Sequence, residues 1–83
     1  MSLEQKIKNE IAEVLGISPS KVVDNARFIE DLGANSLDKT ELIIALEANY
    51  NIRISDEQAN QIICVSDAIK FIEDKLAKRD LTK

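Results

Sequence analysis

Ser36 is the residue of this sequence whose type and position most clearly suit chemistry. Its hydroxyl follows a Gly33-Ala34 turn, precedes an amphipathic segment, and has carboxylates before and after it within residues 30–38. The first turn of a helix presents unpaired N–H groups and a partial positive charge, and both favour an attached phosphate. The chain has no histidine, so a Ser-His-Asp triad is excluded and we assign no catalytic residue. Ser36 is therefore either a helix cap or a serine that another protein modifies.

The composition predicts one small globular domain, residues 1–83, with 45% hydrophobic and 31% charged residues. No apolar run approaches the about 20 residues that cross a membrane, and the N-terminal residues lack the apolar segment of a signal peptide. The single cysteine, Cys64, cannot form an internal disulfide, so we expect a reducing compartment, the cytoplasm. Clusters of His or Cys are missing from the sequence, and we therefore predict no metal site.

The middle of the chain is acidic. Residues 28–67 carry eight acids against Lys39 and Arg53, a local charge of −6 within a net charge of −4. Such a surface repels nucleic acid and favours basic protein partners, which electrostatic steering attracts. A solvated acidic face that only keeps the protein soluble is the alternative interpretation.

Helical periodicity runs through most of the chain, and strand alternation persists nowhere. A first helix begins with a capping-box pattern at Ser2 and ends at Gly16. A short helical turn opens at Ser18-Pro19, inside a long connection from about residue 17 to 35. Long connections in compact domains are usually functional, which again directs attention to the segment before Ser36.

Three further helices follow. The second spans residues 36–50, with Asn35 as N-cap, and the short third opens at Ser55 and ends near residue 61. The fourth follows a Ser66 cap, and residues 78–83 are expected to form a frayed tail. The sum is an all-α fold, a small antiparallel four-helix bundle with three main helices, one short helix and a long first connection.

Two apolar stripes share the second helix. The first suits the core and consists of Leu42, Ile43, Leu46 and Tyr50. The other lies on a neighbouring face among carboxylates, which argue against deep burial. We therefore predict an exposed, acid-ringed surface that binds partners, the docking stripe, made of Asn35, Leu37, Asp38, Glu41, Ile44, Glu47 and Ala48.

Residues 28–72 resemble an acyl carrier protein, and the first helix and the length also fit. The resemblance rests on residues 28–38, 41–47, 54–59 and 62–69. It implies that a phosphopantetheinyl transferase moves phosphopantetheine from coenzyme A to Ser36 Oγ, whose new thiol then holds acyl groups as thioesters. It further implies a monomeric carrier without enzymatic activity, docking on fatty-acid synthesis enzymes and acyltransferases that present basic surfaces. In this family Asp38 would help to organise the transferase's Mg²⁺.

The resemblance also implies a place for the acyl chain inside the bundle. Candidate lining residues, which equally suit a packed core, are Phe28, Leu46, Ile54, Ala59, Ile62 and Ile69.

The chain departs from the family pattern at several positions. Asn35 replaces the usual Asp and Lys39 a usually neutral residue, while Ala48, Asn51 and Arg53 stand where acids are frequent. These departures leave open a carrier dedicated to a polyketide, peptide or lipid-modification pathway. An unmodified helical interaction module, with Ser36 as a cap, is the alternative from another functional class.

Overall fold

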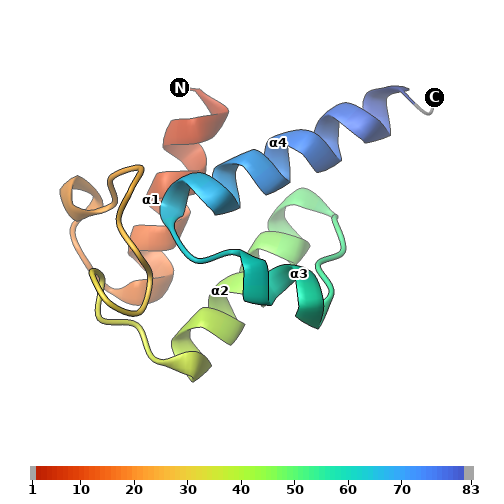
Figure 1. The fold of residues 1–83 in the computed structure, drawn as a ribbon. Coiled ribbons are helices and arrows are strands. Elements are labelled where there is room, and N and C mark those ends of the chain that lie inside the picture. Colours follow the sequence, from red (N-terminus) through yellow and green to blue (C-terminus); the bar gives the residue numbers. More distant parts are fainter. Residues whose placement is uncertain (1, 82–83) are drawn as a thin grey trace.

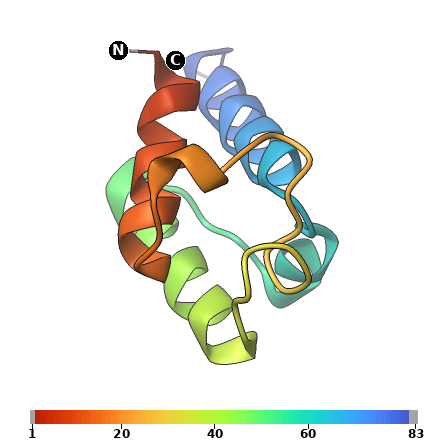
Figure 2. The same ribbon diagram turned by 90° about the vertical axis from the view of Figure 1, so that its left-hand side faces the viewer.

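The computed structural model describes residues 2–81, with side chains to residue 78. Figure 1 shows four α-helices and a short 3₁₀ turn along the chain. Their bounds are α1 Leu3–Leu15, η1 Pro19–Lys21, α2 Ser36–Tyr50, α3 Asp56–Gln61 and α4 Val65–Leu81. Helix α1 contacts both α2 and α4. Both ribbon views place the start of α1 and the end of α4 on one side of the molecule, opposite the start of α2 (Figures 1 and 2). The described part of the chain thus confirms the predicted helical bundle.

Helix α1 begins and ends as its sequence predicts. Ser2 Oγ accepts the Gln5 N–H at 3.1 Å, and Gly16 ends the helix with φ of 69°, a left-handed conformation that glycine adopts without strain. Ile7 and Ile11 lie on one face and are fully buried. On its outer side, Glu10 accepts hydrogen bonds from Tyr50 Oη at 2.6 Å and Asn49 Nδ2 at 2.8 Å, which join α1 to the end of α2. Burial and this bond to Glu10 together raise the pKa of Tyr50.

The long connection between α1 and α2 is fastened to the rest of the bundle by backbone bonds. Phe28 N–H donates to Ile63 O at 3.0 Å, and Val65 N–H donates to Ala26 O at 3.0 Å. Lys8 of α1 adds an ion pair to Asp24 at 2.8 Å. Phe28 itself is 1% exposed and occupies the core. The connection is therefore a packed part of the fold, which gives the residues before α2 a defined position.

The start of α4 differs from the prediction. The helix begins at Val65, and Ser66 lies inside its first turn instead of capping it. Asp67, also in the first turn, reaches back to the residues before the helix, and its Oδ2 accepts the N–H of Ile63 at 3.1 Å and of Cys64 at 3.2 Å. Ser66 N–H instead donates to Asp24 O at 2.8 Å, so a bond from a distant loop takes the place of the local cap.

The predicted frayed tail, residues 78–83, continues α4 as far as Leu81, and residues 82–83 lie outside the described residues. A single hydrophobic core connects the helices, and no charged or polar side chain among the described residues is buried in it. The largest fully buried side chains are those of Phe28, Ile7, Ile11, Leu42, Leu46, Ile72 and Val65.

Candidate functional site

The start of α2 leaves the Ser36 hydroxyl free. Asn35 Oδ1 accepts the Asp38 N–H at 2.8 Å, and Asp38 Oδ2 accepts the Asn35 N–H at 3.2 Å, forming a complete capping box. Because Asn35 is the cap, Ser36 is the first helical residue. Its side chain is exposed, and within residues 2–78 its Oγ has no hydrogen-bond partner.

The loop before α2 fixes where this hydroxyl stands. Gly33 adopts φ of 73°, a left-handed turn, and Ala34 then inserts into the core at 5% exposure. Ala34 N–H donates to Phe28 O at 2.9 Å. A buried anchor two residues before Ser36 therefore holds the helix start in place while the serine itself points outward.

The local backbone suits a negatively charged group on Ser36. The N–H groups of Ser36 and Leu37 have no acceptor among the described residues, as expected in a first helical turn. The 15 residues of α2 direct the positive end of their summed dipole at the same point. A phosphodiester oxygen attached there would meet these donors without displacing any existing bond.

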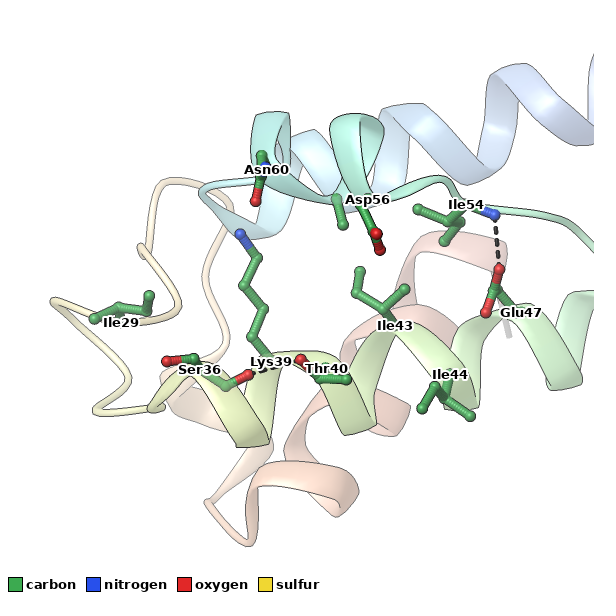
Figure 3. Close-up of a pocket in the computed structure, with 11 residues that line it drawn as sticks. Ile29, Ser36, Lys39, Thr40, Ile43, Ile44, Glu47, Ile54, Asp56 and Asn60 are labelled. Atoms are coloured by element: carbon green, nitrogen blue, oxygen red, sulfur yellow. Dashed lines mark hydrogen bonds between the residues drawn. The ribbon is translucent and has the colours of Figure 1, made fainter.

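A cavity of about 490 Å³ lies between α2 and α3, with Ser36 at its edge. Figure 3 shows Ile43 of α2 and Ile54 facing each other across it, with Ser36 and Lys39 toward one end. The whole lining consists of Ile29, Ser36, Lys39, Thr40, Ile43, Ile44, Glu47, Ile54, Asp56, Ala59 and Asn60. The side chains next to Ser36 are mostly polar, whereas isoleucines form much of the remaining wall.

Two of the six predicted lining residues, Ile54 and Ala59, do line this cavity. The other four do not line it. Phe28 lines an adjoining cavity of about 270 Å³, and the remaining three, Leu46, Ile62 and Ile69, are core residues at 6% exposure or less, so their contact with an acyl chain stays a prediction. Helical spacing identified apolar positions correctly, but it could not separate side chains packed against a neighbouring element from those that face a gap.

The apolar residues of the docking stripe are exposed on α2, as predicted. Leu37 is 66% exposed, Ile44 is 58% exposed, and Ala48 is exposed, while Glu41 stands in solvent between them. By contrast, Leu42, Ile43 and Leu46 on the adjacent face are buried. Helix α2 thus presents an uncovered apolar stripe beside a carboxylate, as the two-stripe pattern predicts.

Glu47 does not have the role expected for a free docking carboxylate. Its Oε2 accepts the Ile54 N–H at 2.8 Å (Figure 3), and its side chain is half-buried. This bond ties the last turns of α2 to the segment that leads into α3. Asp38 and Asn35 are likewise engaged in capping α2, so among the predicted acids Glu41 is the one without an internal bond in the described residues.

Sequence reasoning missed the polar side chains around the cavity, namely Lys39, Thr40, Asp56 and Asn60. The helical spacing of Ser36, Thr40, Ile43 and Glu47 could have found one wall, because these residues share a face of α2. Nothing local indicates Asn60, which reaches the site only through the placement of α3.

In the described part of the chain, no group of three His, Cys, Asp or Glu residues could hold a metal ion. Nor does any described helix combine the length and apolar character needed to cross a membrane.

Comparison with known proteins places this geometry in a family. Residues 5–72 match the family described as "Phosphopantetheine attachment site". An acyl carrier protein of Solidesulfovibrio magneticus is 51% identical over 75 residues, which are 90% of this chain and 96% of that protein. One from Helicobacter pylori is 51% identical over 78 residues, 93% of this chain and 100% of that protein. One from a Sulfurovum species is 49% identical over 73 residues, 88% of this chain and 97% of that protein.

The family match spans all of α2 and α3, most of α1 and about the first half of α4. The relatives align over nearly their whole length, so the likeness extends to the complete domain rather than to one motif. Proteins of this kind are carriers, and their cofactor is phosphopantetheine held by a covalent bond. On this evidence the chain belongs to the acyl carrier protein family.

Proposed function

We propose that Ser36 Oγ is the point at which phosphopantetheine is attached, and that the chain then carries acyl groups as thioesters in fatty-acid synthesis. The observation that carries this proposal is the free, exposed hydroxyl at the first residue of α2, beside the α2–α3 cavity. The attached group supplies a terminal thiol on a flexible arm, which is the chemistry of the carrier. The protein supplies a rigid mount and does no catalysis of its own.

Attachment is a phosphoryl-group transfer in which the chain is the acceptor. Ser36 Oγ forms a bond to the phosphorus that bears pantetheine, the pyrophosphate bond of coenzyme A breaks, and the adenine nucleotide leaves. The hydroxyl proton is released in the same step. No side chain in the described part of the molecule bonds Ser36 Oγ and could serve as its base, so a transferase must supply one. The free N–H groups of Ser36 and Leu37 suit the charge of the product.

The partners that fit are a phosphopantetheinyl transferase and fatty-acid synthesis enzymes or acyltransferases with basic surfaces. Leu37, Ile44 and Ala48 offer apolar contact, and Glu41 offers an exposed carboxylate for Lys or Arg. Asp38 keeps one carboxylate oxygen outside its capping bond, which leaves it able to approach the transferase's Mg²⁺. Contacts of this mixed kind support fast and exchangeable docking by a monomeric carrier. The lone Cys64 is consistent with work in the cytoplasm.

A carrier serving a dedicated polyketide, peptide or lipid-modification pathway is the second candidate. It is favoured by the diluted acidity of the docking surface, where Lys39 and Arg53 add cations and Asn35 replaces an acid expected from the family resemblance. Mass spectrometry of thioesters isolated on the protein from its native host distinguishes the two. Saturated and 3-oxygenated acyl chains of graded length support fatty-acid synthesis, whereas a single unusual acyl or aminoacyl group supports a dedicated pathway.

The attachment itself is tested by intact-mass measurement after incubation with coenzyme A, Mg²⁺ and a transferase. We expect one phosphopantetheine to add to the wild-type chain and none to Ser36→Ala. Ser55→Ala is the matched control, because Ser55 also stands at a helix start but uses its hydroxyl as a cap. It should be modified like the wild type, and labelling that persists in Ser36→Ala would refute the assigned site.

A further inference from the structure

Lys39 lies between the attachment serine and the apolar part of the cavity. Figure 3 shows its side chain extending from α2 toward Asn60 of α3, with Ser36 and Ile29 on one side and Ile43 on the other. A second cavity of about 270 Å³ lies next to the first, and Ile29, Lys39 and Asn60 line both. The Lys39 side chain is therefore part of the partition between two adjoining spaces.

The Lys39 ammonium has no carboxylate partner. No ion pair within 4.0 Å joins it to any acid in the described residues, although three carboxylates line the two cavities. Glu30 pairs with Arg27, and Glu47 accepts the Ile54 N–H. The Lys39 side chain is nevertheless half-buried. A half-buried ammonium group without a paired carboxylate is strongly attracted to a negative charge that is introduced nearby.

Such a charge would appear three residues away on modification. We propose that Lys39 is the gate of the cavity, and that the phosphodiester on Ser36 opens it by drawing the Lys39 ammonium away from α3. This inference rests on the proposed attachment at Ser36 and goes beyond it. Residues three apart on a helix are neighbours on its surface, so Lys39 can reach a phosphate on Ser36 by rotating about its own side-chain bonds. The aliphatic stem then lies along α2 and no longer crosses toward Asn60.

Opening the gate has a consequence for the cargo. The path from Ser36 into the cavity leads past Lys39, and its removal also joins the two spaces that share its side chain. An alkyl chain attached through the arm could then bury its carbons against Ile43, Ile54 and Ala59. In the unmodified chain, the Lys39 side chain stands between Ser36 and Ile43 of this apolar wall (Figure 3). Lys39 thus couples the presence of the arm to the availability of the space for its cargo.

The test compares side chains of equal length and different charge at position 39. Lys39→Met keeps the length of the stem and removes the ammonium, and Lys39→Ala removes the partition altogether. Lys6→Met is the matched control, because Lys6 is an exposed lysine on α1 outside both cavity linings. Each variant is loaded with an octanoyl thioester, loading is verified by intact mass, and the rate of thioester cleavage by hydroxylamine is measured against free octanoyl-pantetheine.

We expect the loaded wild-type protein and Lys6→Met to be cleaved equally slowly, because the chain shelters in the open cavity. Lys39→Met should be cleaved about threefold faster, a change that matches the strength of an exposed ion pair. Lys39→Ala should be no faster than the wild type, since nothing remains to close the entrance. Equal rates for Lys39→Met and the wild type would overturn the gate, as would a loaded wild type cleaved like free octanoyl-pantetheine.

A second measurement observes the gate directly and does not depend on the cargo. On attachment of phosphopantetheine, the NMR signals of the Asn60 side-chain amide and the Lys39 ammonium should shift in the wild type. In Lys39→Met the Asn60 signal should keep its position. An Asn60 signal that moves equally in both proteins would contradict the proposal. Failure of any protein to gain mass would instead refute the attachment at Ser36, so the two failures are distinguishable.

Discussion

Helices α2 and α3 both begin with a capping box, but a serine occupies a different position in each. At α3 the serine is the cap, since Ser55 Oγ accepts the Gln58 N–H at 3.1 Å and Gln58 Oε1 accepts the Ser55 N–H at 3.0 Å. At α2 the same reciprocal pair is made by Asn35 and Asp38, and the serine follows one residue later. The two helix starts therefore share their geometry and differ in whether the hydroxyl is already bonded.

The difference shows what a serine at a helix start requires if its hydroxyl is to be modified. A capping hydroxyl faces the helix backbone and stabilises it, so modification would have to break that bond. A serine at the first helical position keeps the favourable N–H groups and dipole while its oxygen remains available. Ser2 and Ser18 also cap their helices. Ser66 in the first turn of α4 is not a cap either, but its hydroxyl lies 3.2 Å from Cys64 Sγ. Among the helix starts in the described chain, α2 is thus the one whose first turn holds a serine hydroxyl without a bonding partner.

The sharpest way to break this comparison is to move the serine back by one residue. In the double variant Asn35→Ser with Ser36→Ala, the hydroxyl would become the cap of α2, as in α3. We expect the modification rate to fall by about two orders of magnitude or more, because a displacement of roughly 1 Å costs that much in a transfer reaction. The rate is measured by timed intact-mass analysis with a transferase. Asn35→Ser alone, which keeps Ser36, is the control and should be modified readily; a double variant modified at a comparable rate would end the distinction.

A second prediction concerns the hydrogen bond from the Ile54 N–H to Glu47, which ties α2 to the segment before α3. Replacing Glu47 by Ala leaves the N–H of Ile54, a residue that is 7% exposed, without its acceptor. We expect the free energy of unfolding to drop by about 2 kcal/mol, the usual cost of an unpaired buried donor. Urea denaturation measures this loss. Glu41→Ala on the exposed face of α2 should cost almost nothing, and equal losses would contradict the internal role of Glu47.

The capping difference itself predicts a smaller effect on stability. Ser55→Ala removes the cap of α3 and should lower the free energy of unfolding by about 1 kcal/mol. Ser36→Ala should leave it nearly unchanged, because Asn35 carries the cap of α2 and the Ser36 hydroxyl has no bond to lose. Urea unfolding of the two variants side by side tests the pair. A Ser36→Ala protein as destabilised as Ser55→Ala would show that Ser36 contributes to capping.

The smallest expected effect is a pH dependence at the start of α4, where Asp67 is the acceptor. Burial raises the pKa of Asp67, but the N–H bonds from Cys64 and Ile63 outweigh it and hold that pKa below its usual 3.8. A lowered pKa in the folded state means that the stabilisation is present above the unfolded value and is lost as pH falls through the folded one. As pH falls below about 4, the free energy of unfolding should therefore decrease less steeply in Asp67→Asn than in the wild type. Denaturant unfolding at a series of pH values measures it. Identical slopes would exclude Asp67 as a source of acid sensitivity.

Local patterns in the sequence predicted most of the fold. The start of α2 at Ser36, its end at Tyr50 and the Asn35 cap follow from capping preferences and apolar spacing within one segment, and the structure has them at the same residues. The Ser55 cap and the end of α3 at Gln61 were predicted on the same grounds. These features depend on bonds between residues at most four apart, which is why a sequence displays them.

The sequence-based predictions were wrong or incomplete where a residue from another segment determines the role of a side chain or N–H group. Ser66 looks like a cap, but its N–H donates to the backbone oxygen of Asp24, a residue far away in the sequence that precedes both α2 and α3. Glu47 looks like a free surface acid, but it reaches the backbone of Ile54. The predicted lining omitted Asn60 for the same reason, since Asn60 comes to line the cavity beside Lys39 only after α3 has packed across α2. Tertiary packing chooses among partners that a local pattern leaves equivalent.

The central claim is that the arm is attached to Ser36, the first residue of α2, whose hydroxyl neither caps the helix nor has a hydrogen-bond partner in the described residues. It is tested most directly by locating the modification. The wild-type chain, after reaction with coenzyme A, Mg²⁺ and a transferase, is digested and its peptides are fragmented in a mass spectrometer. The account predicts a single phosphopantetheine on Ser36 and unmodified Ser55 and Ser66. A phosphopantetheine found on either of those serines, or on none, would contradict it.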